Sequence, residues 1–186
     1  SEVNTALKYD FIFSSGSVRF NTTRFEHGAA VEAALADPSI GQQTLYLQAM
    51  GGLRNELHFP GLLGLAGTPM RAVAQAVLHV PVDGDFGDFA PPTQLFAFRK
   101  GDEGQDLLLP DQVSGQGQIG GTYDADNKAY RLNVTRWVQG LLNGTYTDPR
   151  LGFMAGSSGI SINRAVLNGP AHADRPMRLE VTFTTY

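Results

Sequence analysis

The chain has 186 residues, of which 42% are hydrophobic and 17% charged, and its formal net charge is −4. This length is enough to bury a sizeable core, and we expect residues 1–186 to form a single domain. The acidic balance argues against nucleic-acid binding, which needs a basic surface to neutralise phosphates. Because there is no cysteine, disulfides and thiolate metal sites are excluded. No apolar run reaches the ~20 residues of a membrane span.

Alternating apolar and polar residues predict strands along most of the chain. In the first half we expect a hairpin over residues 6–21, and strands over residues 44–50, 53–59, 71–82 and 94–99. Gly51-Gly52, between two of these strands, indicates a tight hairpin or a bulge. Alanine-rich residues 28–37 favour a short helix, which ends where Pro38 restricts the backbone. Residues 61–69 are expected to form a helical turn or a buried loop.

The second half continues the same pattern. We expect a hairpin around Asp124–Lys128, then strands over residues 150–156, 161–169 and 177–186. Roughly ten strands at a spacing of about ten residues, with few helices, predict an all-β fold. The expected architecture is an antiparallel β-sandwich of jelly-roll type with one or two short helices.

The segment Tyr130–Gly144 combines a strand with a helix and contains the only tryptophan. Thr135 is expected to cap the helix by accepting its first free amide hydrogens. Trp137, Val138, Leu141 and Leu142 then fall on one apolar face, and Asn143-Gly144 predicts a left-handed stop. We interpret Trp137 as a structural plug at an end or edge of the sandwich, because large aromatic rings dominate core energetics. The alternative is that Trp137 is a platform for a sugar.

Four pieces of the sequence resemble, in order, the C-terminal part of bacterial surface lipoproteins grouped as domain of unknown function 4270. They are LYLQAMGGLRNELHFPGL (45–62), AQAVLHVPV (74–82), GGTYDADNKAYRLNVTRWVQGLLNG (120–144) and NRAVLNGP…RPMRLEVTFTTY (163–186). The resemblance implies a protein at the outer-membrane or extracellular surface of the Bacteroidetes type. It implies no activity, and the family supplies no catalytic residues to place on this chain.

The loop after residue 82 is the best candidate binding site. Asp83, Asp85 and Asp88 supply three carboxylates from one loop, as calcium requires, but the EF-hand spacing fails and a solvated loop is the other interpretation. Phe86 and Phe89 in the same loop could contact a glycan or a protein, or fold back over the sandwich. We therefore predict Asp83, Asp85, Phe86, Asp88 and Phe89 as binding residues, and expect no cofactor apart from the calcium alternative.

No pattern in the sequence predicts catalysis. The four histidines lack metal-ligand spacing, and Gly156-Ser157-Ser158-Gly159 lacks the spacing of a nucleophile elbow. Six arginines between residues 129 and 186 are interpreted as scattered surface charges that affect solubility and steering.

Three functions stay open at this point. The first is a non-enzymatic bacterial cell-surface β-sandwich protein that binds a surface protein partner or builds a surface assembly. The second is a lectin-like module for a polysaccharide, and the third is a hydrolase. An unpaired edge strand or an exposed apolar patch would favour the first. Exposed aromatic rings along one groove would favour the second, and two close carboxylates in a cleft would favour the third.

Overall fold

The computed structural model describes residues 24, 26–50, 52–66, 71–84, 88–113, 120–156 and 159–185. The hairpin predicted over residues 6–21 lies outside this part of the chain, as do Asp85 and Phe86 of the predicted binding loop. The described residues form antiparallel sheets packed as an all-β sandwich with short helices. The predicted all-β sandwich is confirmed, and its jelly-roll type stays a prediction.

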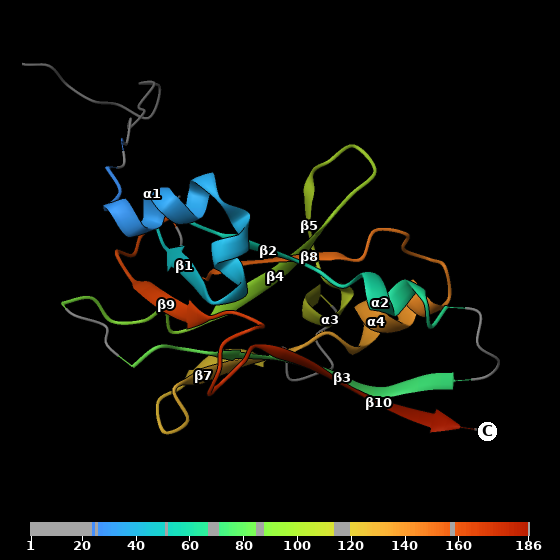
Figure 1. Cartoon of the computed structure of the whole chain (residues 1–186). Helices are drawn as coiled ribbons and strands as arrows, with labels where there is room; N and C mark the ends of the chain where they lie inside the picture. The colour runs from blue at the N-terminus through green and yellow to red at the C-terminus, as the bar shows by residue number, and fades with distance from the viewer. Residues whose placement is uncertain are drawn as a thin grey trace, which may run out of the picture.

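The described strands form three sheets (Figure 1). The first has the order β10-β3-β7-β6, formed by Arg178–Thr185, Arg71–Pro81, Ala129–Asn133 and Gly120–Asp124. The second has the order β2-β8-β4-β5, formed by Asn55–His58, Arg150–Ala155, Leu95–Lys100 and Asp106–Leu108. The third is the pair β1 (Thr44–Gln48) and β9 (Arg164–Asn168).

Isolated bridges join the three sheets at their margins. Val82 bridges to Leu167 and so connects the end of β3 to β9, and a second bridge connects the residue before β4 to β6. Gln48 and Leu53 exchange two backbone hydrogen bonds of 3.1 Å each. The chain therefore reverses between the two strands as a tight hairpin would, but β1 and β2 then enter different sheets.

The core lies between the inner faces of the strands, as the period-2 alternation predicts. Leu78 and Val80 of β3 and Leu132 of β7 are almost completely buried. Tyr130 of β7 is also buried, and its hydroxyl donates a hydrogen bond of 2.7 Å to the carbonyl oxygen of Pro92. Burial raises the pKa of Tyr130, so its phenol stays protonated and keeps this bond.

The helices are more numerous than the one or two that the sequence predicts. The described residues contain α1 (Ala29–Ala36), a 3-10 helix η1 (Pro38–Gln42), α2 (Pro60–Leu63), α3 (Pro110–Val113) and α4 (Thr135–Leu142). The three additional helices, η1, α2 and α3, are short and each starts at a proline, whose fixed φ suits the first helical position. Within the described part of the chain, no helix is long and apolar enough to cross a membrane.

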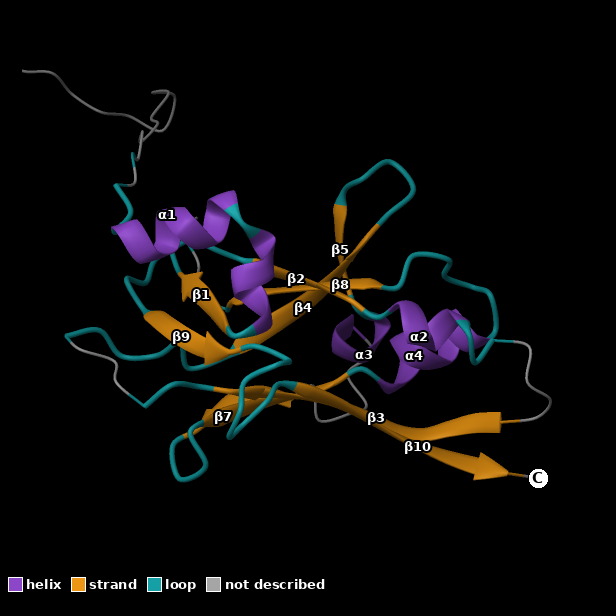
Figure 2. Cartoon of the chain, viewed as in Figure 1, coloured by secondary structure: helices purple, strands orange, loops and turns teal. Residues whose placement is uncertain are grey.

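Helix α4 fills one end of the sandwich together with α2 and α3 (Figure 2). Trp137, Val138 and Leu141 are buried on the face predicted from the sequence, and Leu142 is partly buried. The ring of Trp137 meets the ring of Phe59 edge-on, with centroids 6.0 Å apart. A ring without solvent exposure cannot serve as a sugar platform, so the geometry agrees with the interpretation of Trp137 as a plug.

The predicted cap of α4 is wrong. The amide nitrogens of Arg136 and Trp137 donate to the two carboxylate oxygens of Asp111, at 2.8 and 3.0 Å. The hydroxyl of Thr135 instead accepts a hydrogen bond of 2.8 Å from the amide of Ala76 in β3. The cap therefore comes from α3, more than twenty positions earlier in the sequence, because packing brings α3 against the start of α4. At the other end, Gly144 adopts the predicted left-handed conformation with φ of 74°.

A close contact across the second sheet gives the first prediction. The ring of Phe98 lies over Gly152, where an added Cβ would come within 2.1 Å of the ring, and Arg54 and Lys100 cover the ring from outside. We expect Gly152→Ala to lower the free energy of unfolding by about 1–3 kcal/mol, because the ring must move out of a packed position. Urea unfolding measures the change. The control Gly61→Ala, with nothing within 4 Å of the added Cβ, should be neutral or mildly stabilising. Equal values for the two variants would contradict the prediction.

Candidate binding site

The loop that follows β3 is attached to strand β9 at both of its described ends. The amide of Asp83 donates to the carbonyl of Val166 at 2.9 Å. Beyond the undescribed residues, the carbonyl of Ala90 accepts from the amide of Arg164 at 3.3 Å and from the side chain of Asn163 at 3.0 Å. The predicted binding loop is therefore anchored beside the third sheet, at the end of the sandwich opposite α4 (Figure 1).

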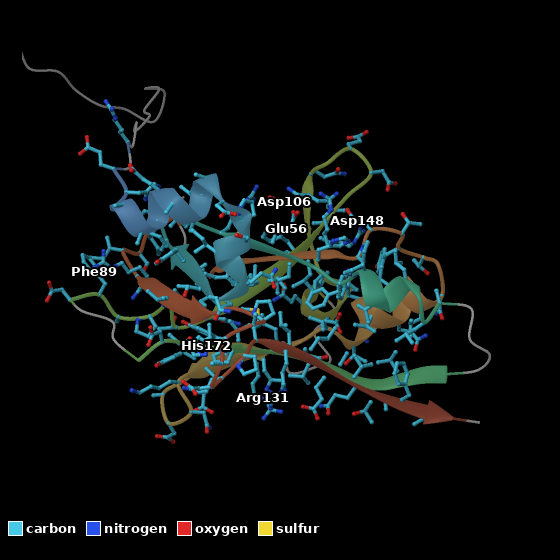
Figure 3. The ribbon with its side chains drawn as sticks, in the orientation of Figure 1. Glu56, Phe89, Asp106, Arg131, Asp148 and His172 are labelled. Carbon is cyan, nitrogen blue, oxygen red and sulfur yellow. The ribbon has the colours of Figure 1, made fainter. Side chains whose placement is uncertain are left out.

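The structure separates the predicted loop residues into different environments. Asp83 is exposed, and its carboxylate accepts a hydrogen bond of 2.7 Å from the amide of Gly84. Asp88 is also exposed, whereas Phe89 is half-buried under the guanidinium of Arg164, which lies 4.1 Å from the ring centroid. Figure 3 shows Phe89 on the loop next to β9. Phe89 thus positions an arginine by a cation–π contact, a role that the sequence pattern did not suggest.

The described residues do not assemble a metal site. Within the described ranges, no three His, Cys, Asp or Glu side chains lie together as ligands for a metal ion. Asp85, the middle residue of the predicted calcium set, lies outside those ranges, so calcium binding by Asp83, Asp85 and Asp88 stays a prediction.

A cavity of about 530 Å³ opens between α1, β1, β9 and the start of this loop. Its lining combines a tyrosine with charged and amide side chains: Tyr46, Gln48, Asp83, Arg164, Glu26 and His27. Planar donors and acceptors of this kind can form paired hydrogen bonds with a polar ligand, and the size suits a small ligand or one anchoring side chain. Asp83 is the predicted residue that the structure places in this cavity.

A second cavity of about 280 Å³ lies farther along α1 and shares Val31 with the first, and it is mainly apolar. Its hydrophobic lining comes from the helix and from the strands beneath it: Val31, Ala34, Leu35, Leu45 and Leu53. Both cavities therefore lie where α1 meets β1, and Val31 of the helix and Tyr46 of the strand line each of them. We call the exposed residues of α1 together with this second cavity the α1 surface.

Helix α1 itself has no buried residue. Glu32 is its single charged residue, and Leu35 is 60% exposed. The sequence predicted the helix but not its exposure. The sequence held no signal for this exposure, because a segment such as AAVEAALA, which has no polar face, is expected to be buried.

The acid–base chemistry of a hydrolase is not visible at this end of the molecule. Among the described residues, Asp111 is the one carboxyl whose pKa is raised, through burial. Asp111 lies at the opposite end, where both of its oxygens accept amide hydrogens of α4. Its raised pKa therefore accompanies a structural cap rather than a group poised over a cleft.

Comparison with known proteins adds no further assignment: no protein-family model, no curated protein and no solved structure matches this chain.

Proposed function

We propose that this chain is a non-catalytic binding module of a bacterial cell surface, and that it contacts a protein partner through the α1 surface. The observation that carries the proposal is the exposure of α1. A helix of eight residues is too short to be stable alone, and most helices gain their stability by burying one face. Because α1 is apolar and buries none of its residues, a partner that covers it would supply the missing burial.

The surroundings of α1 support the same proposal. Exposed apolar surface beside open cavities is typical of protein interfaces, where a few anchoring side chains fill pockets and contribute most of the affinity. The second cavity is mainly apolar and the first has more polar groups in its lining, so a partner would find apolar surface next to hydrogen-bonding groups. This arrangement matches the usual organisation of an interface.

The cellular location is part of the proposal. Its support is the resemblance to bacterial surface lipoproteins in residues 45–186, together with a charged fraction of 17%, which is low for a globular protein. A polar but weakly charged surface is common in extracellular β-proteins.

A polysaccharide is the second candidate ligand, and the larger cavity is the observation that favours it. Its lining places the ring of Tyr46 near the amide of Gln48, the guanidinium of Arg164 and the carboxylate of Asp83. These groups can bind the hydroxyls of a sugar while the ring contacts its apolar face. In this case the predicted loop residue Asp83 would contact the ligand directly.

The decisive experiment compares three proteins in a pull-down from the native cell envelope, with a glycan array beside it. Leu35→Glu places a charge on the α1 surface, and Val113→Glu is the matched control, since Val113 is 70% exposed on α3. We expect one partner to be retained by the wild type and by Val113→Glu, and Leu35→Glu to bind it at least ~tenfold more weakly.

The glycan array separates the two candidates. A blank array together with the loss caused by Leu35→Glu supports the protein partner. An array signal that Arg164→Gln abolishes and Leu35→Glu leaves intact would replace the protein partner with a polysaccharide. Equal recovery of the partner by all three proteins would overturn the role of the α1 surface.

A further inference from the structure

Two arginines and a histidine form one row across the first sheet. The register pairs Arg178 of β10 with His79 of β3, and His79 with Arg131 of β7. Directly paired residues lie on the same face of a sheet, and Figure 3 shows Arg131 pointing away from the body of the sandwich. The row therefore lies on the outer face, where the two arginines flank the histidine.

A third arginine reaches this row from the connection between β9 and β10. The guanidinium of Arg175 donates hydrogen bonds to the carbonyl oxygens of Asn127 and Lys128 in the β6–β7 hairpin. These acceptors are neutral, so they fix the position of the guanidinium without compensating its charge. Arg131, Arg175 and Arg178 line a cavity of about 370 Å³ together with His79.

Three carboxylates lie near these arginines, and two of them, Asp124 and Asp174, line the same cavity. Asp124 caps the β6–β7 turn by accepting from the amides of Asp126 and Asn127, both at 3.0 Å. Glu180 lies 3.2 Å from the Nε2 atom of His79. Asp174 is exposed at the rim of the cavity.

Even so, none of the three arginines forms a salt bridge with a described carboxylate. Arg131 and Arg178 are separated only by His79 in the register, so their charges repel one another. An arrangement of this kind is expected where an anion supplies the missing charge.

The state of His79 agrees with a positive field from the two flanking arginines. Burial lowers its pKa first, and the charges of Arg178 and Arg131 lower it further, against the opposing effect of Glu180. The imidazole is therefore neutral at neutral pH. An anion between the two arginines would weaken their repulsion of a proton on His79 and shift the pKa of the ring upward.

We propose that Arg131, Arg175 and Arg178 form a binding site for an oxyanion group, such as a carboxylate, sulfate or phosphate, with His79 as its floor. Arg131 and Arg178 lie on strands two positions apart, about 10 Å between backbones, so their long side chains can close on an anion from both sides. The guanidinium fork is suited to the oxygens of such a group. The site lies on a different face from the α1 surface and does not depend on the function proposed for it.

The test is an NMR titration of the labelled protein with sulfate, phosphate and glucuronate, each against chloride at equal ionic strength. We expect saturable shifts of the His79 ring signals, and a higher pKa of His79 when sulfate is bound. Sulfate is used for the pKa because it does not itself titrate near neutral pH. The order of affinities shows whether the site prefers a tetrahedral or a planar oxyanion.

Variants of the arginines test whether the anion binds in this cavity. The double variant Arg131→Gln with Arg178→Gln should bind ~100-fold more weakly or not at all, since each charge-assisted hydrogen bond accounts for about tenfold. Arg136→Gln on α4 removes the same kind of charge outside the cavity and should bind as the wild type. Arg175→Gln, at an exposed loop position, provides a second probe if the double variant fails to fold. Shifts that chloride reproduces, or undiminished binding by Arg175→Gln and the double variant, would overturn the proposal.

Discussion

Replacing Trp137 with alanine is expected to lower the free energy of unfolding by about 3–5 kcal/mol, the usual cost of deleting a buried large aromatic ring. Trp137 is fully buried and packs edge-on against Phe59, so its removal leaves a cavity between α4 and α2. Domains of this size are typically stable by about 5–15 kcal/mol, and the variant would therefore lose a large share of its stability. Urea unfolding followed by circular dichroism measures the loss, because the variant no longer contains a tryptophan to report by fluorescence.

A second substitution at the same position tests whether the stability comes from the packing of the ring. Within the described part of the chain, the indole nitrogen of Trp137 is buried without a hydrogen-bond partner. Trp137→Phe removes that unpaired donor and keeps most of the ring, so it should cost only about 1–2 kcal/mol. If Trp137→Ala cost less than about 1 kcal/mol, the ring would not be the plug that the packing indicates.

Replacing Asp111 with alanine is expected to cost about 2–4 kcal/mol. Asp111 is buried, and its two carboxylate oxygens accept the first amide hydrogens of α4 from Arg136 and Trp137. Loss of an N-cap costs about 0.5–2 kcal/mol, and each buried donor left without a partner adds about 1–3 kcal/mol before relaxation. Fluorescence of Trp137 reports the unfolding directly. The comparison variant Thr135→Ala tests the cap predicted from sequence; it removes the acceptor of the Ala76 amide, and a loss larger than that of Asp111→Ala would contradict the assignment to Asp111.

The pH dependence of this cap has a definite sign. Burial raises the pKa of Asp111, against the opposing effect of the amide hydrogen bonds. A carboxyl whose pKa is higher in the folded than in the unfolded protein contributes stability that is fully present below its unfolded pKa. That contribution is lost as the pH rises through the folded pKa.

Asp111→Asn cannot titrate and therefore provides the reference. The free energy of unfolding of the wild type, relative to this variant, should increase as the pH falls from about 7 toward about 4. Both proteins share all other carboxyls, so their titration largely cancels from the difference. A difference that does not change with pH would show that folding leaves the pKa of Asp111 unaltered.

The strands were predictable because their signals are local. Alternation in residues 71–82 and 177–186 gave β3 and β10, and Asn143-Gly144 gave the end of α4. The turn around Asp124 followed from the preference of Asp and Asn for capping their own backbone. In each case the residues that determine the conformation lie within a few positions of one another.

The candidate sites were predictable only in part. Sequence patterns placed Asp83 and Phe89 in one loop, but not Arg164, which joins them from β9. Nor could they show that α1 buries none of its residues, since burial depends on how the helix meets the sheet beneath it. The scattered arginines of the C-terminal third became a cluster only when the register aligned Arg178 and Arg131 around His79.

By itself, the sequence determined the all-β class, most of the strands and the buried face of α4. The tertiary structure decided that Asp111 rather than Thr135 caps this helix, that the α1 surface is exposed, and that three arginines share one cavity. The physical reason is the range of the interactions. Hydrophobic periodicity and turn preferences act between near neighbours in the chain, whereas caps, cavities and charge clusters join residues that only the pairing of distant strands brings together.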